Sequence, residues 1–295
     1  MALAQAIPRL HLRNILFTTD FSSASDSALP YALALGRWYE SRIVIAHVVP
    51  REPQLSIPLD LLSKQDDPNW RRARQRMGTL SADTRIAEQR HEEILIQGDL
   101  RHVLSGIICQ HEIDMLVLGT HGRQGLSKLV LGSSAEEIFR HASCPVLTVG
   151  PKVCREPEGL EALATIVFAT DFSPASLHAL PYALSLAEEN QARLIMVHLM
   201  ALVPFQQREA VTEAETKRLK ALVPPDAESW CRPEFVVNFQ FPAEGILEAV
   251  EHYNGDLLVM GVHKREAPRL AAHMLWTTAY DVVCNAPCPV LTVRA

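Results

Sequence analysis

The residues best suited to chemistry in this 295-residue chain form a glycine-rich stretch, Gly119-Thr-His-Gly122, followed after nine residues by Gly132-Ser133-Ser134. Glycine lacks a Cβ atom, so Gly119 allows a tight turn and Gly122 allows an anion to approach the main chain. Gly132, Ser133 and Ser134 would offer N–H donors and hydroxyls at a helix N-terminus, where the helix dipole favours an anion. The stretch predicts a phosphate-binding loop. The alternative is that the glycines only form turns and a serine only caps the helix.

The segments around this loop are of the kinds that position a phosphate site. An apolar run, Met115–Leu118, precedes the loop, and Ala135–Phe139, a plausible helix, follows it. A strand, a glycine-rich loop and a helix start in succession present backbone N–H groups to an anion. Arg123, directly after Gly122, could supply a counter-charge.

The same unit occurs twice in the sequence. Residues 15–50 and 166–201 share 17 identities in 36 ungapped positions, counted directly from the sequence. Both halves also end alike, in Cys144-Pro-Val-Leu-Thr-Val149 and Cys288-Pro-Val-Leu-Thr-Val293. The protein is therefore a tandem duplication.

Within each repeat, short β-branched runs alternate with helical stretches. Several runs lack a polar/apolar alternation, which indicates strands buried on both faces, as in a parallel sheet. The sequence predicts two doubly wound five-stranded α/β domains, at residues 1–150 and 160–295, with a Pro- and Gly-containing linker at 150–159. The predicted strands are 14–18, 42–48, 93–97, 115–118 and 145–149, then 165–169, 193–199, 234–238, 256–260 and 289–293.

Composition narrows the class of protein. The net charge is −6, which argues against a general nucleic-acid binder. The first residues lack the pattern of a signal peptide, and no apolar run is long enough for a membrane helix. Six cysteines without a Cys-x-x-Cys pair favour reduced, buried thiols. We expect a cytoplasmic protein with no nucleic-acid or membrane partner.

The motif reads Gly, two residues, Gly, nine residues, Gly-Ser. It resembles the nucleotide-binding signature of the universal stress protein family. The Thr-Asp-Phe-Ser run after the first strand and His47-Val48 are similar to that family too, and the resemblance covers nearly the whole chain. It implies the adenine nucleotide alpha hydrolase-like fold. It also implies ATP, with or without Mg²⁺, bound without rapid hydrolysis.

The resemblance also implies roles for individual residues of the first repeat. Three residues at the end of the first strand would flank the nucleoside, and the backbone of one residue would contact adenine. Further residues would line the loop or hold the phosphates. In that order they are Thr18, Thr19 and Asp20; Val48; Leu118, Gly119, His121 and Gly122; and Gly132, Ser133, Ser134 and Ala135.

Asp20 has two interpretations. A carboxylate at the carboxyl end of a strand can bind a ribose hydroxyl or a base edge. It can equally cap the following helix, where Ser22 and Ser23 compete with it. Asp171 stands at the same position in the second repeat, so capping would explain both aspartates.

The second repeat departs from the motif. Lys264 replaces the second glycine, and Trp276 falls where Gly132 stands, with Thr277 and Thr278 in place of the serines. A tryptophan there would fill the phosphate path. We expect that the second repeat does not hold ATP phosphates in the same way, although Asp171, Met260 and Gly261 could shape a pocket for another ligand.

The sequence thus predicts an ATP-binding regulatory protein whose output is a conformation or a partner. Rival functions are a slow ATPase or nucleotidyl-transferring enzyme, or a module for another ligand. A P-loop Gly-Lys-Ser/Thr is missing, and a lone loop histidine (His121, His263) is a weak catalyst candidate. The basic run Trp70–Arg76 fits a solvated helix face, with an anion or partner surface as the alternative.

The last strands of the two domains are expected to pair as an intramolecular pseudo-dimer, which would cover exposed sheet edges, and a homodimer of the whole protein is a further expectation.

Overall fold

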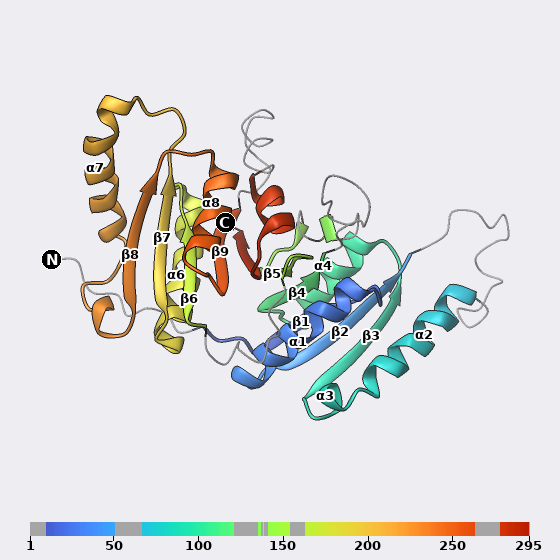
Figure 1. Ribbon diagram of the computed structural model, residues 1–295. Coiled ribbons are helices and arrows are strands. Elements are labelled where there is room, and N and C mark those ends of the chain that lie inside the picture. Colours follow the sequence, from blue (N-terminus) through green and yellow to red (C-terminus); the bar gives the residue numbers. More distant parts are fainter. Residues whose placement is uncertain are drawn as a thin grey trace. The chain divides into compact units, whose positions relative to one another are not determined.

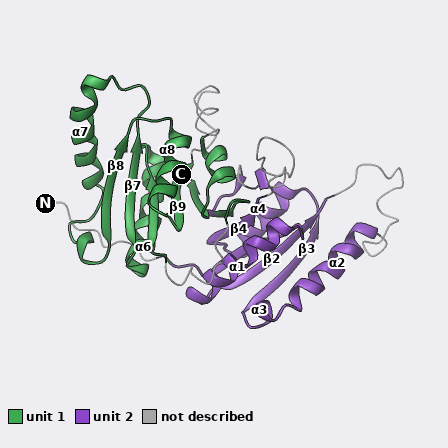
Figure 2. Ribbon diagram, in the orientation of Figure 1, with its two compact units in different colours: residues 1–10, 121–131, 147–295 green, residues 11–120, 132–146 purple. Residues whose placement is uncertain are grey.

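The computed structural model describes residues 10–50, 67–120, 135–136, 138, 141–153, 163–262 and 278–294, and every structural statement below concerns these residues. They fall into two compact units (Figure 2). One unit contains the described residues from 11 to 146, and the other contains Leu10 and the described residues from 147 onward. Within this described part of the protein, no helix is long and apolar enough to cross a membrane.

The first repeat is a parallel sheet in which sequence order and spatial order differ. The strands lie in the order β3-β2-β1-β4-β5, and the β1–β2, β1–β4 and β2–β3 pairings are parallel. The central strands are buried on both faces, with Ile15, Leu16 and Phe17 at most 1% exposed, which explains their lack of alternation. The elements are β1 (Asn14–Thr18), α1 (Ser23–Trp38), β2 (Arg42–Val49), α2 (Pro68–Ser81), α3 (Thr84–Ala87), β3 (His91–Gln97), α4 (Leu100–Gln110), β4 (Met115–Gly119) and β5 (Val146–Val149).

The second repeat has the same order, β10-β9-β6-β7-β8, with parallel pairings between β10 and β9, β9 and β6, β6 and β7, and β7 and β8. Residues 278–285 are also helical. The α/β fold predicted from the duplicated pattern is therefore confirmed. The elements are β6 (Thr165–Ala169), α6 (Pro174–Asn190), β7 (Arg193–Leu199), the 3-10 turn η4 (Phe205–Gln207), α7 (Arg208–Lys220), η5 (Ala227–Ser229), β8 (Arg232–Asn238), α8 (Pro242–His252), β9 (Leu257–Val262) and β10 (Val290–Arg294).

Side-chain caps fix where the helices of the first repeat begin. Ser22, Asp67, Asp83 and Asp99 each accept a hydrogen bond from a backbone N–H of the first turn. Such caps satisfy donors that the helix itself leaves unpaired, and each contributes about 1 kcal/mol. They fix the residue at which each helix starts.

One aspartate in each repeat binds the backbone at the start of the repeat's first strand. Asp114 Oδ2 accepts bonds from the N–H groups of Arg13 and Asn14, at 2.7 and 2.9 Å. Asp256 Oδ2 accepts the equivalent bonds from Ala164 and Thr165, both at 2.9 Å. The two repeats therefore share side-chain interactions as well as topology.

The connections place helices on both faces of the first sheet (Figure 1). The backbone moves outward from β1 through β2 to β3 and then returns past β1 to β4. Because parallel crossovers are right-handed, α1 and α2 cover one face and α4 covers the other. The order of strands reverses between β1 and β4, so a crevice for a ligand is expected beyond the carboxyl ends of these two strands.

Candidate functional site

The carboxyl ends of β1 and β4 bring predicted site residues together. Phe17 pairs with Val117 in the sheet, so Thr18 and Leu118 come one residue later in neighbouring strands. Thr19 and Asp20 follow β1 directly, and Gly119 ends β4. The sequence-predicted residues of these two strands therefore lie on adjacent strand ends, at the point where the sheet order reverses.

The loop from β1 to α1 is organised around the Asp20 carboxylate. Asp20 Oδ1 accepts hydrogen bonds from the Ser22 N–H at 3.0 Å and from the hydroxyls of Ser22 and Ser25 at 2.5 Å. Ser22, rather than Asp20, caps α1. Asp20 is exposed even so, at the same edge as Gly119. The structure thus gives Asp20 a structural role in the loop while leaving its side chain open to solvent.

Val48 lies in β2 beyond the end of β1. The Thr19 N–H donates to Ala46 O at 3.0 Å, which continues the β1–β2 hydrogen-bonding pattern past the last residue of β1. In a parallel strand, the N–H and C=O of one residue point toward the same neighbouring strand, and so do those of every second residue along the chain. The N–H and C=O of Val48 therefore face the β1 side, like those of Ala46, but past the end of that strand.

Phe21, His47 and Arg76 gather beside Asp20. The His47 Nδ1–H donates to Thr19 O at 2.7 Å, and its ring centroid lies 4.4 Å from that of Phe21. The Arg76 guanidinium carbon lies 5.8 Å from the Phe21 centroid. Burial lowers the pKa of His47, while Thr19 O and the charge of Asp20 raise it and the charge of Arg76 lowers it. His47 is therefore held as a neutral hydrogen-bond donor at neutral pH.

For Arg76, the sequence predicts a solvated helix face, with an anion or partner surface as the alternative. Trp70–Arg76 does lie in helix α2, as predicted. Arg76, however, projects over the ring of Phe21, next to the predicted site. Its spacing of three residues from the buried Ala73 of α2 was the available signal, since residues three or four apart share a helix face.

Gly119 is required for a reason that the sequence did not show. It is the last residue of β4, and a β-carbon at this position would overlap the carbonyl oxygen of Ala24 in α1. The tight turn that we also expect it to permit stays a prediction. The same holds for Gly261 against Ala175 in the second repeat. This glycine lets helix and strand approach closely in both repeats.

Part of the predicted loop lies outside the described residues. Ala135 is helical and buried, at 8% exposure, as expected for a residue at the start of the helix after the loop. The assignments that lie outside the described residues are His121, Gly122, Arg123, Gly132, Ser133 and Ser134, and in the second repeat His263, Lys264, Trp276 and Thr277.

The second repeat keeps the ring contacts and adds a carboxylate. Phe172 and His198 have ring centroids 4.7 Å apart, and the Arg218 guanidinium carbon lies 3.8 Å from the Phe172 centroid. Glu215 Oε2 lies 3.4 Å from Arg218 and 4.0 Å from His198 Nε2. Three residues before Arg76, the first repeat has the buried Ala73 instead of a glutamate. The guanidinium of the second repeat is thus held on its ring by an acidic neighbour.

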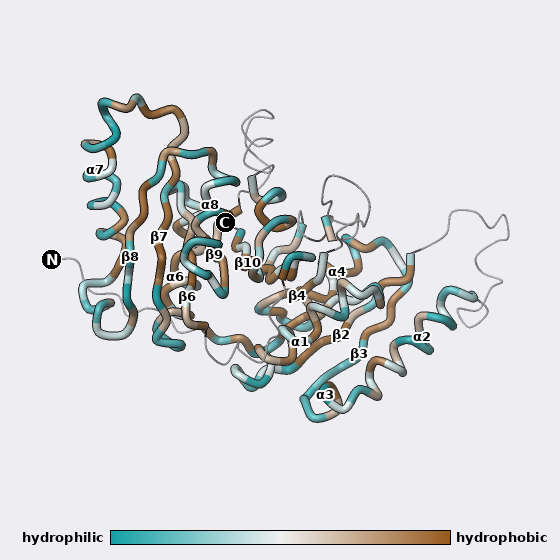
Figure 3. Tube along the Cα trace, in the orientation of Figure 1, coloured by the Kyte–Doolittle hydropathy of each residue, from teal (hydrophilic) through white to brown (hydrophobic). Residues whose placement is uncertain are grey.

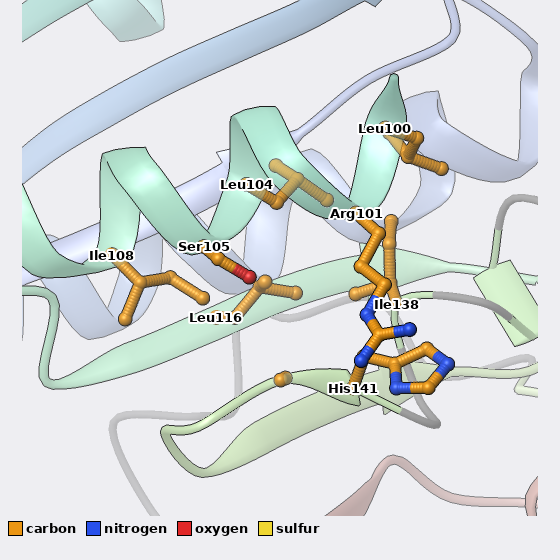
Figure 4. A pocket seen from close by; sticks show the side chains of 9 residues that line it. Leu100, Arg101, Leu104, Ser105, Ile108, Leu116, Ile138 and His141 are labelled. Carbon is orange, nitrogen blue, oxygen red and sulfur yellow. The ribbon is translucent and has the colours of Figure 1, made fainter.

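A separate pocket lies between α4 and β4 (Figure 4). It encloses about 260 Å³, part of which is open solvent, and Leu104, Ile108 and Leu116 give it an apolar wall. Arg101 and His141 also line it, and Figure 4 shows both side chains. None of the sequence-predicted site residues lines this pocket, so we assign no ligand to it.

The side chains that the structure describes contain no group of three or more His, Cys, Asp or Glu residues placed to hold a metal ion.

Comparison with known proteins gives a consistent result over the whole sequence. A universal stress protein from Mycolicibacterium smegmatis is 24% identical over 297 residues, covering 95% of this chain and 96% of that protein. Universal stress protein A homolog 1 of Coxiella burnetii is 28% identical over 148 residues, covering 48% of this chain and 99% of that protein. The crystal structure of a universal stress protein from Archaeoglobus fulgidus has the same fold, with a TM-score of 0.69 and 17% identity over 97% of this chain and 99% of that chain.

The sequence model of the universal stress protein family matches residues 11–150 and again residues 163–294. Because these two matches cover most of the sequence and coincide with its two repeats, the protein belongs to the universal stress protein family, with two copies of the family's domain in tandem.

Proposed function

We propose that the first repeat binds ATP or a related adenine nucleotide and that the bound nucleotide regulates the protein's conformation or its association with a partner. The observation that carries this proposal is the convergence of Asp20, Val48 and Gly119 at the carboxyl end of one sheet, where the strand order reverses. This is the position at which open α/β sheets bind nucleotides.

The nucleoside would lie against the β1 and β2 ends. The peptide groups of Val48 face the space beyond β1 and would donate to and accept from the edge of adenine, while the exposed Asp20 carboxylate would accept from ribose hydroxyls. Thr18, Thr19 and Leu118 would line this part of the site.

The phosphates would lie against the glycine-rich loop. His121, Gly122, Arg123, Gly132, Ser133, Ser134 and Ala135 are proposed to surround them, with backbone N–H groups as the main donors. In the second repeat Lys264 and Trp276 stand where Gly122 and Gly132 stand. We therefore propose that each protein molecule binds one nucleotide through this kind of loop.

ATP would act as a regulatory ligand rather than as a substrate. The sequence has no P-loop lysine motif for rapid phosphoryl transfer. A ligand that binds one conformation better than another shifts the population toward it, and no bond needs to break for that signal.

Isothermal titration calorimetry of the full-length protein with ATP and adenosine tests the proposal. The double replacement Gly122→Lys/Gly132→Trp, which copies the second repeat, is expected to weaken ATP binding at least about 100-fold, because several charge-assisted hydrogen bonds worth about 1.5–3 kcal/mol each are lost. Adenosine, which has no phosphate, is expected to lose much less affinity.

The matched control is the opposite replacement in the second repeat, Lys264→Gly/Trp276→Gly, which should leave the affinity of the first repeat for ATP unchanged. If Gly122→Lys/Gly132→Trp leaves ATP affinity intact, the loop assignment is wrong. Release of phosphate at about 1 per second or faster, a rate typical of enzymes, would instead favour the ATPase function.

A further inference from the structure

The second repeat exposes large apolar side chains at the carboxyl ends of β7 and β8. Leu202 is 90% exposed, Phe205 is 81% exposed and Phe241 is 61% exposed. Leu202 and Phe205 lie in the connection from β7 to α7, and Phe241 lies between β8 and α8. Figure 3 shows the apolar colouring of the β7–α7 connection. Contiguous exposed apolar residues on a soluble protein mark interaction sites more often than isolated ones do.

The two connections form one surface. The Met200 N–H donates to Asn238 O at 2.9 Å, which joins the connections where they leave the sheet. Farther out, the Arg208 guanidinium carbon lies 5.0 Å from the ring centroid of Phe239 and 5.9 Å from that of Phe205. We call this set the Phe205 surface; it consists of Leu202, Phe205, Arg208, Phe239 and Phe241.

Arg208 gives this surface a specific charge. Residues 200–207 and 239–241 contain no ionisable side chain, and Arg208 is the cation beside them. The Glu248 carboxylate borders the 239–241 segment, where it accepts a hydrogen bond from the Gln240 side-chain amide. Arg208 is half-buried, and its Nε–H donates to Val203 O at 3.3 Å. Among the described residues, no carboxylate lies within 4.0 Å of its guanidinium. A partly desolvated guanidinium without a carboxylate favours an anion from a binding partner, and a carboxylate can pair with it through two hydrogen bonds.

We propose that the Phe205 surface docks a short peptide segment of a partner protein in which an apolar side chain stands next to a carboxylate. The apolar group packs on Phe205 and Phe241, and the carboxylate, from Asp, Glu or the end of the peptide, pairs with Arg208. A single cation suits one carboxylate better than an anionic lipid surface, which basic clusters recognise. This docking site belongs to the second repeat and does not depend on nucleotide binding by the first.

Short random peptides displayed on phage provide the first test, with the full-length protein as the target. Enriched sequences are expected to carry an aromatic or aliphatic residue within two positions of Asp, Glu or a free C-terminus. Synthetic peptides of these sequences are then titrated by fluorescence anisotropy, each beside the same peptide with the carboxylate replaced by an amide. The amide is expected to bind about 10- to 30-fold more weakly, the range of an interface residue that dominates binding.

Variants of the protein locate the contact. Arg208→Gln should lower the affinity for the acidic peptide about 10-fold or more and abolish the preference for it over the amide peptide. Phe205→Ser/Phe241→Ser should lower the affinity for both peptides. Leu202→Asn should do so as well, and asparagine tolerates the backbone angle at this position (φ 68°). The matched controls are Lys217→Gln on the same helix and Leu177→Ser, an exposed leucine of α6, and both should bind as the wild type does.

Three results would overturn the proposal. The first is that no peptide is enriched, or that enriched peptides bind Arg208→Gln and Phe205→Ser/Phe241→Ser as well as they bind the wild type. The second is a dimer in sedimentation velocity that Phe205→Ser/Phe241→Ser dissociates, which would assign the surface to a second copy of the protein. The third is binding to phosphatidylcholine–phosphatidylserine vesicles that the same replacement abolishes, which would assign it to a lipid surface. All the replaced side chains are at least partly exposed, so each variant is expected to fold. Circular dichroism checks this.

Discussion

Gly119 at the end of β4 and Ala24 in the first turn of α1 are packed so closely that a β-carbon on Gly119 would overlap the Ala24 carbonyl oxygen. Gly261 and Ala175 repeat this arrangement in the second half of the protein. The first glycine of the motif therefore serves the packing of the fold, and both repeats retain it. Gly122 and Gly132, which the second repeat has replaced, are the glycines that we propose serve a ligand.

Replacing Gly119 or Gly261 by alanine is expected to destabilise the protein by about 1–3 kcal/mol, because the new methyl group meets backbone rather than a flexible side chain. Gly78→Ala is the matched control. Gly78 lies in α2, where a β-carbon would meet no atom within 4 Å, so alanine should stabilise this helix by about 0.5–1 kcal/mol. Urea unfolding of the three variants measures these changes. Equal stability of Gly119→Ala and the wild type would contradict the packing role.

Much of the fold could be predicted from the sequence because the repeated pattern fixes the order of its elements. The strands expected at 14–18, 165–169 and 193–199 have these bounds in the structure, and the others differ by one or two residues at one or both ends. Strands buried on both faces, such as Ile15–Phe17, have no polar/apolar alternation in their sequence. This lack of alternation indicated the parallel sheet.

The side-chain arrangements of the site could not be predicted in this way. The overlap at Gly119 depends on how closely α1 approaches β4, and the position of Arg76 depends on how α2 packs on the sheet. Neither distance is determined by local sequence. The exposure of Phe205 and Phe241 is similarly a property of the folded connections, since a phenylalanine in sequence suggests burial.

The two interpretations of Asp20 can be separated by comparing it with Asp171. Both aspartates accept a bond from the backbone N–H two residues later, so asparagine should keep the loop in both. If Asp20 also binds the ribose, Asp20→Asn weakens ATP binding about 10-fold, since hydrogen bonds to charged groups are worth about 1.5–3 kcal/mol. Asp171→Asn is expected to leave calorimetric ATP affinity unchanged. Equal affinity of Asp20→Asn and the wild type would leave Asp20 with its loop role alone.

His47 is expected to titrate below its ordinary pKa of 6.5, because burial penalises the imidazolium form. As the pH falls below about 6.5, the unfolded state takes up a proton at this position before the folded state does, so stability is lost between the unfolded and folded pKa values. An NMR titration of the His47 ring measures the folded value directly, with His47→Asn used to assign the resonance. A midpoint above 6.5 would show that the hydrogen bond to Thr19 O and the charge of Asp20 together outweigh burial.

The cysteines should differ sharply in reactivity. Burial raises the pKa of Cys144 to about 12 and that of Cys231 to about 11, so neither forms appreciable thiolate near neutral pH. Cys109 is exposed. Iodoacetamide at about pH 8, followed by peptide mass spectrometry, is expected to modify Cys109 in the native protein and to leave Cys144 and Cys231 unmodified. Modification of Cys144 at the rate of Cys109 would mean that the packing around β5 opens readily.

Native mass spectrometry of the full-length protein with ATP tests the central claim most directly, because it counts the nucleotides bound to each protein molecule. One ATP per molecule is expected for the wild type, and none for Gly122→Lys/Gly132→Trp at the same ATP concentration. Two ATP molecules per protein, or one that persists after Gly122 and Gly132 are replaced, would contradict a single nucleotide site in the first repeat built on its glycine-rich loop.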